Sequence, residues 1–287
     1  MRDDRDSPVP APKGSAIAAR ARRAAAALVL GLALAAQPAA ALRLPESLDV
    51  ADMAWIELRE AIAAGYRTVI VPSGGVEQNG PHMILGKHDH IARHAARRIA
   101  AELGDALVVP VLPFAPQGRL DPPEGNRRFP GTLGISEEAF MATLEGVARS
   151  LRAAGFRTIC LLAEHGASQA PQQRLAARLS AEWRREGVRV VALSRWYAAI
   201  AEQDAWLRGQ GETEATIGSH AGIGDTSELM AVHPPGVDLS RLPARAAELP
   251  ALGASGDPAR ASAARGEVLL AIRIAAALAE IRAARAR

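Results

Sequence analysis

Short apolar runs alternate with longer amphipathic stretches along most of the chain. Four runs rich in Val, Ile and Leu predict buried β-strands. Between them apolar residues recur at helical spacing, as in Met53, Ile56 and Ile62. This alternation predicts parallel βαβ units and a sheet covered by helices on both faces, as in an α/β fold. The predicted strands are residues 67–72, 106–112, 156–162 and 188–193.

The helical segments have start and stop signals of their own. Ser136 precedes two glutamates, which is typical of a helix N-terminus, and Gly104 follows a periodic stretch, as at many C-termini. Residues 113–132 form a loop of the length usually reserved for function. Pro and Gly scattered through 234–257 predict irregular structure. The predicted helices are residues 50–64, 91–103, 136–154, 172–186, 196–207, 226–232 and 266–287.

The amino-terminal segment has a different pattern from the rest of the chain. An arginine-rich stretch at 20–23 precedes thirteen uncharged residues at 24–36, and three alanines follow at 39–41. This is the pattern of a signal peptide, and thirteen apolar residues fall short of the roughly 20 that a spanning helix needs. We therefore predict a signal peptide at 1–41 and export to the periplasm or the extracellular space. The general and twin-arginine routes both stay open, and the cleaved protein is expected not to insert stably into membranes.

Most of the charge imbalance also lies in this segment. It holds six of the 34 Lys and Arg residues and three of the 31 Asp and Glu residues, so residues 42–287 carry 28 of each sign. A net charge of zero argues against a nucleic-acid partner. The single cysteine, Cys160, excludes an intrachain disulfide. We predict one α/β domain over residues 42–287.

Candidate chemistry is concentrated in three polar loops, at residues 73–88, 163–168 and 218–227, which hold most of the histidines. Loops at the carboxyl ends of parallel strands meet at one edge of a sheet, where ligands bind. Carboxylates and imidazoles together suit a divalent ion such as Zn, Mn or Fe, which makes a bound water more acidic. Glu164 and His165 are neighbours, so a continuing strand pleat would point their side chains in opposite directions.

Four ordered segments resemble the creatininase (creatinine amidohydrolase) family. They are similar to the family's Gly-x-x-Glu-Gln-His-Gly-Pro-His segment with its following Asp, to Phe-Pro-Gly-Thr, to His-Gly-Gly-Asn and to His-x-Gly-x-x-Glu-Thr-Ser. The corresponding residues are 74–89, 129–132, 165–168 and 220–227. The resemblance implies a three-layer αβα sandwich with a mostly parallel sheet. It also implies a homo-oligomer, often a hexamer, that hydrolyses an amide or cyclic-amide C–N bond of a small molecule by metal-activated water.

The same resemblance assigns roles to individual residues. By position, it implies that Glu77, Asp89 and His165 are metal ligands. His220 corresponds to the histidine that protonates the leaving nitrogen, and Asp225 to a carboxylate of the catalytic site. Alternatives remain at each position: Asp89 and Asp225 could cap helices, and His165 could be a hydrogen-bonded core histidine.

Three departures from the family pattern bear on the metal. Asn79 stands where the family has a ligating histidine, Ala167 where creatininase itself has a second-metal carboxylate, and Asp225 where the family has glutamate. We therefore predict one ion per chain, unless His82 or His88 supplies a ligand. The departures also leave open a second function, that of an exported binding or assembly protein without catalysis.

Overall fold

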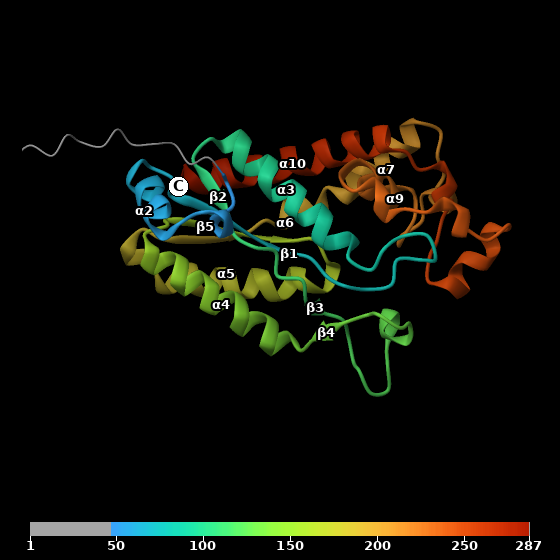
Figure 1. Cartoon of the computed structure of the whole chain (residues 1–287), viewed down its shortest axis with the longest axis horizontal. Coiled ribbons are helices and arrows are strands. Elements are labelled where there is room, and N and C mark those ends of the chain that lie inside the picture. Colours follow the sequence, from blue (N-terminus) through green and yellow to red (C-terminus); the bar gives the residue numbers. More distant parts are fainter. Residues whose placement is uncertain (1–46, 287) are drawn as a thin grey trace, which may run out of the picture. The chain divides into compact units, whose positions relative to one another are not determined.

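The centre of the molecule is a four-stranded parallel sheet, which follows from the four apolar runs. The structure, a computed structural model, describes residues 47–286 (Figure 1). The strands lie in the order β2-β1-β5-β6. Thr68 lies opposite both Ala106 and Thr158, and Thr158 lies opposite Arg189. The strands are β1 (Thr68–Ser73), β2 (Ala106–Val108), β5 (Thr158–Ala163) and β6 (Arg189–Ala192).

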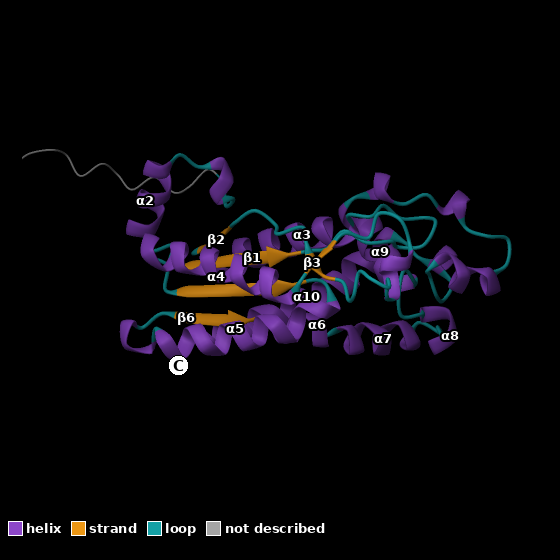
Figure 2. Cartoon of the chain, turned by 90° about the horizontal axis from the view of Figure 1, so that it is seen from below, coloured by secondary structure: helices purple, strands orange, loops and turns teal. Residues whose placement is uncertain are grey.

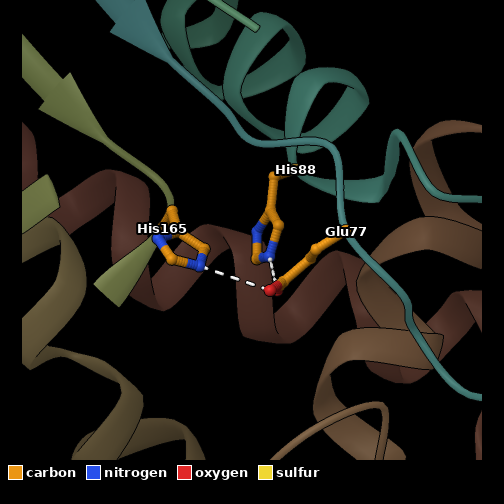
Figure 3. A group of neighbouring side chains, drawn as sticks. All are labelled: Glu77, His88 and His165. Carbon is orange, nitrogen blue, oxygen red and sulfur yellow. Dashed lines mark hydrogen bonds and ion pairs between the residues drawn. The ribbon is translucent and has the colours of Figure 1, made fainter. Parts of the chain in front are cut away.

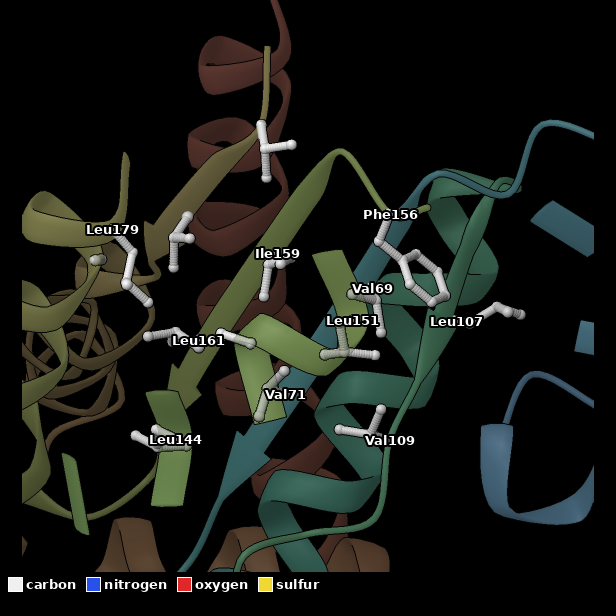
Figure 4. Close-up of a cluster of buried hydrophobic side chains, with 14 of the residues drawn as sticks. Val69, Val71, Leu107, Val109, Leu144, Leu151, Phe156, Ile159, Leu161 and Leu179 are labelled. Atoms are coloured by element: carbon white, nitrogen blue, oxygen red, sulfur yellow. The ribbon is translucent and has the colours of Figure 1, made fainter. Parts of the chain in front are cut away.

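Helices cover both faces of this sheet, which confirms the three-layer αβα prediction (Figures 1 and 2). The side chains of each strand alternate between two apolar cores, so that Val69 and Val71 enter one and Ile70 the other. Figure 4 shows the first core, in which Ile159 and Leu161 also lie. Helices α2 (Trp55–Ala63), α4 (Glu137–Ala154) and α5 (Gln169–Glu182) pack there, and α3 (Lys87–Leu103), α6 (Ser194–Ala198) and α10 (Ala263–Arg285) pack in the second core.

Several predicted boundaries shift for local reasons. The second strand stops at Val108 rather than 112, since Pro110 cannot donate to a ladder. Ser136 caps α4 as predicted, because its side chain accepts from the Ala139 N–H. The predicted helix 196–207 is divided at Ala199 into α6 and α7 (Ile200–Gly209). The long loop at 113–132 contains β3 (Ala115–Pro116), which pairs in parallel with β4 (Gly134–Ile135) just after the loop.

The shift with the largest consequence is at the start of α3. The predicted helix begins at residue 91, whereas α3 begins at Lys87. The first turn contains no apolar periodicity, so nothing in its pattern marks it as helical. His88 and Asp89 therefore lie in a helical turn, where neighbouring side chains point about 100° apart.

The remaining elements lie mainly beyond the carboxyl ends of the strands, as Figure 2 shows for α7, α8 and α9. None of the helices in residues 47–286 is long and apolar enough to cross a membrane. The helices not yet given bounds are α8 (Glu214–Ile217), α9 (Ile223–Val232) and the 3-10 helices η1 (Val50–Asp52), η2 (Gly125–Arg128), η3 (Gly166–Ser168), η4 (Arg184–Glu186), η5 (Pro234–Gly236), η6 (Leu239–Arg241), η7 (Ala246–Leu252) and η8 (Pro258–Arg260).

Candidate metal centre

Three side chains from different elements converge beyond the carboxyl edge of the sheet (Figure 3). Glu77 lies in the loop after β1, His88 in the first turn of α3, and His165 just after β5. His88 Nε2 is 2.8 Å from Glu77 Oε1, and His165 Nε2 is 3.4 Å from Glu77 Oε2. One ligand atom from each residue lies within 4.8 Å of the others, and residues 47–286 hold no second such group of three His, Cys, Asp or Glu.

Glu77 is the anionic member of this group. Its side chain is 2% exposed, and Asn126 Nδ2 donates to its Oε2 at 2.7 Å. Burial alone would raise the pKa of Glu77, but hydrogen bonds from His165 and His88 outweigh it and hold that pKa well below its usual range. One carboxylate and two imidazoles are the donor set of many catalytic zinc and iron sites. The three residues therefore fit a divalent ion such as Zn, Mn or Fe.

Asp89, a predicted ligand, is not in this group. Its Oδ1 accepts the Gly75 N–H at 3.1 Å. A Cβ added to Gly74 would lie 2.0 Å from the same oxygen, so only a glycine leaves room for the Asp89 carboxylate there. Asp89, Gly74 and Gly75 therefore shape the turn after β1. The early start of α3 is the physical reason, because it directs His88 toward Glu77 and Asp89 toward the turn. His88 thus lies where Asp89 was expected.

Two other residues weighed as ligands have structural roles. Asn79 is fully buried, and its Nδ2 donates to the carbonyl oxygens of Glu77, Ile84 and Leu85 at 2.9, 3.0 and 3.3 Å. His82 Nε2 lies 3.0 Å from Thr226 Oγ1. Burial lowers the pKa of His82 to about 4, so its ring is neutral at physiological pH. Neither residue belongs to the three-ligand group.

The two predicted catalytic residues lie close together at the start of α9: His220 precedes the helix, and Asp225 is in its first turn. Asp225 Oδ2 accepts the Ala221 N–H at 2.8 Å and lies 2.8 Å from Lys87 Nζ. Ala221 has a φ of 53°, a left-handed conformation that an alanine adopts only when its surroundings impose it. Next to it, His220 Nε2 lies 3.0 Å from the Gln78 carbonyl oxygen. Asp225 therefore holds the backbone that carries His220.

The charges of Asp225, Lys87 and His220 are set by burial and by ion pairing. Burial favours the neutral form of Asp225, but Lys87 outweighs it and lowers the pKa of Asp225 well below its usual range. Burial likewise opposes the charged form of Lys87, yet Asp225, Glu77 and Glu164 raise its pKa. Burial lowers the pKa of His220, which favours its neutral form. The sequence singled out His220 and Asp225, but no local signal marked Lys87.

The three proposed ligands and the group formed by Lys87, His220 and Asp225 line one cavity of about 820 Å³. This volume is in the upper part of the roughly 300–1,000 Å³ range of small-molecule sites. Tyr197 and Gly166 also line it, and a Cβ added to Gly166 would lie 2.7 Å from the Tyr197 hydroxyl oxygen. The ionisable residues of its lining include Glu77, Lys87, His88, Glu164, His165, His220 and Asp225.

A buried ion-pair network supports this cavity. Arg273 of α10 donates to Glu164 Oε2 at 2.7 Å and to Glu228 Oε2 at 2.9 Å. Its guanidinium carbon lies 3.8 Å from the centroid of the Trp196 ring, and Trp196 Nε1 donates to Glu164 Oε2 at 2.7 Å. Glu164 Oε1 is 3.8 Å from His88 Nδ1, so the network reaches the metal-ligand group. The sequence offered one overlooked signal for it: Arg273 is a lone charge in an apolar helical stretch.

An αβα sandwich with a carboxylate and two imidazoles beyond the ends of its parallel strands defines a metal-dependent α/β enzyme. The chain belongs to the creatininase family, whose model, described as creatinine amidohydrolase, matches residues 51–281. Members of this family are metal-dependent amidohydrolases acting on C–N bonds. The family resemblance, the fold class and the enzyme class predicted from the sequence are confirmed.

Relatives of known name have two different activities. The creatinine amidohydrolase of Pseudomonas putida is 28% identical over 250 residues, which cover 79% of this chain and 93% of that protein. The mycofactocin precursor peptide peptidase of Mycolicibacterium smegmatis is 29% identical over 216 residues, which cover 71% of this chain and 79% of that protein.

Solved creatininase structures have the same fold and contain metals. A crystal structure of creatinine amidohydrolase matches with a TM-score of 0.69 and 26% identity, covering 83% of this chain and 97% of that one. A structure described as "Creatininase Mn" matches with a TM-score of 0.67 and 26% identity, covering 83% and 98%. A creatininase variant described as "Zn-Zn type" matches with a TM-score of 0.69 and 25% identity, with the same coverage of the two chains.

Proposed function

We propose that the chain is an exported amidohydrolase that cleaves an amide or cyclic-amide C–N bond of a small molecule, with one divalent ion held by Glu77, His88 and His165. The convergence of these three residues in the wall of a large cavity carries the proposal. As a homo-oligomer, for which the family resemblance favours a hexamer, it would act in the periplasm or outside the cell.

The residues of the cavity have complementary tasks in this reaction. A Zn, Mn or Fe ion at the three ligands would supply a more acidic water and polarise the carbonyl group. Overall, a water oxygen bonds to the carbonyl carbon, the C–N bond breaks, and the leaving nitrogen takes a proton. His220, held by the Gln78 carbonyl and neutral before the reaction, is placed to take a proton from the attacking water and to pass it to the leaving nitrogen. Asp225 keeps its loop in the strained conformation that positions it.

Charge balance supports one ion rather than two. The buried ionisable side chains of the cavity and its supporting network, together with Asp225, whose side chain is 27% exposed, sum to −2 when the carboxyl groups are ionised and the imidazoles are neutral. A single divalent cation neutralises this charge, whereas a second would leave an uncompensated buried charge of +2, which is costly. The residues counted are Glu77, Glu164, Asp225 and Glu228 against Lys87 and Arg273.

Metal content and hydrolysis together test the proposal. We expect purified protein to contain about one Zn, Mn or Fe ion per chain, by mass spectrometry of the metals. Hydrolysis of at least one member of a panel containing creatinine, other cyclic amides and short peptides should stop on chelation and return with the ion. The panel spans the activities named for the two relatives, because the cavity volume does not separate them.

A second function remains for the case in which catalysis is absent. Asn79 and Ala167 favour it, since they take the places of two ligands in the family pattern. A protein that holds its ion, binds an amide and hydrolyses nothing would be an exported binding or assembly protein. Two tightly held ions per chain would contradict the charge argument.

Export is tested at the amino terminus. The proposed signal peptide at 1–41 lies outside the described residues, so its support is the sequence pattern alone. Protein isolated from the native cell should begin near Leu42 and fractionate outside the cytoplasm, as read by N-terminal sequencing. An intact amino terminus in the cytoplasmic fraction would contradict the proposal.

A further inference from the structure

The cavity contains a second cationic group that the three-ligand centre does not use. Lys87, the residue before His88, is only 1% exposed, yet it lines the cavity. A lysine ammonium has three N–H donors, and a buried one is costly unless it is paired. Within residues 47–286, Asp225 is the one ion-pair partner of Lys87, with Nζ and Oδ2 2.8 Å apart. The remaining donors are therefore available to a ligand in the cavity.

The surroundings of Lys87 hold it in place. It lies in the first turn of α3, and it lines the same cavity as the three proposed ligands, Glu77, His88 and His165. Asp225 anchors it from the first turn of α9, directly after the loop that carries His220. A purely structural ion pair would not need to face the cavity, whereas this one forms part of its wall.

We infer that the Lys87 ammonium donates to the carbonyl oxygen of the scissile amide. When a water oxygen bonds to the carbonyl carbon, the C=O π pair moves onto that oxygen, and Lys87 stabilises the resulting negative charge. When the C–N bond breaks, the pair returns to re-form C=O, and the nitrogen takes its proton from His220. The proposed metal ion is then one positive charge of the site, and the ammonium group of Lys87 is the second. The inference rests on the proposed function.

The variant Lys87→Met tests this role, since methionine fills similar space without charge. We expect kcat to fall about 100- to 1,000-fold, as when a donor to a developing oxyanion is removed, and KM to change little. Metal content should stay at one ion per chain. Activity within threefold of the unaltered protein would overturn the inference, and so would a loss of the ion in parallel with activity.

A binding measurement separates this inference from the proposed function. Acetohydroxamate, an anionic oxygen ligand of metal ions, can be titrated into cobalt-substituted protein and followed by the visible spectrum of the cobalt. We expect Lys87→Met to weaken its binding at least tenfold, whether or not a hydrolysed amide has been found. Equal affinity in both proteins would overturn the inference. Failure of the unaltered protein to hydrolyse any amide would contradict the proposed function alone.

Two further variants exclude a folding explanation. Lys87→Met leaves Asp225 without its cation, so the double variant Lys87→Met/Asp225→Asn removes both charges and keeps an acceptor for the Ala221 N–H. The double variant should fold, hold its ion and bind acetohydroxamate as weakly as the single variant. Recovery of the affinity in the double variant would overturn the inference. Arg265→Met breaks an ion pair with Glu212 outside the cavity lining and should leave the affinity unchanged.

Discussion

Replacement of His88 by alanine should weaken metal binding more than about 100-fold and reduce hydrolysis in proportion. Removing even a residue that only supports a metal ligand typically costs 10- to 100-fold in affinity, and the loss of a ligand from a set of three costs more. Metal content after dialysis against a weak chelator, together with kcat/KM, measures the effect. His165→Ala should behave in the same way, because both imidazoles lie against Glu77.

The neighbouring variant Asp89→Asn is the matched control. Asparagine keeps an oxygen that can accept the Gly75 N–H, so the turn after β1 should persist. Metal affinity in this variant should stay within about threefold of that of the unaltered protein, a change of less than about 1 kcal/mol. If Asp89→Asn loses the ion while His88→Ala retains it, the ligand set predicted from the sequence is correct and the grouping around His88 is not functional.

Replacement of Arg273 by methionine should lower the free energy of unfolding by about 3–5 kcal/mol. The change leaves two carboxylates, each 2–3% exposed, without a counter-charge, and breaking a buried pair in this way costs several kcal/mol. Urea unfolding at fixed metal concentration measures it. The control Arg97→Met breaks an exposed ion pair with Asp49 and should cost less than about 1 kcal/mol.

The destabilisation of Arg273→Met should also depend on pH. Burial raises the pKa of Glu228 to about 7 even beside Arg273, so we expect the contribution of Glu228 to the stability of the unaltered protein to fall as pH rises through 7. Without Arg273 the pKa of Glu228 rises further, so the carboxyl group stays protonated up to a higher pH. The free-energy cost of a buried, ionised Glu228 therefore arises only at that higher pH. The loss of stability should therefore be smaller at pH 6 than at pH 8. A loss that is the same at both values would mean that Glu228 is not the group left uncompensated.

The sequence by itself determined the layers of the fold and two of the three proposed ligands. Strands such as β1 and β5 are continuous β-branched or apolar runs, because both of their faces are buried, and such runs are visible without any structure. Glu77 and His165 follow directly on those strands, so the parallel topology alone brings them to one edge. The motifs around them also specify the family.

Only the tertiary structure decided which residues complete the site. The choice between His88 and Asp89 depends on where α3 begins, and a polar first turn has no apolar periodicity from which its helical phase could be read. Lys87 and Arg273 are buried because their partners, Asp225, Glu164 and Glu228, come from distant parts of the chain. A charged residue has the same local sequence pattern whether it meets water or a buried counter-ion, since its burial depends on side chains that only the folded chain brings to it.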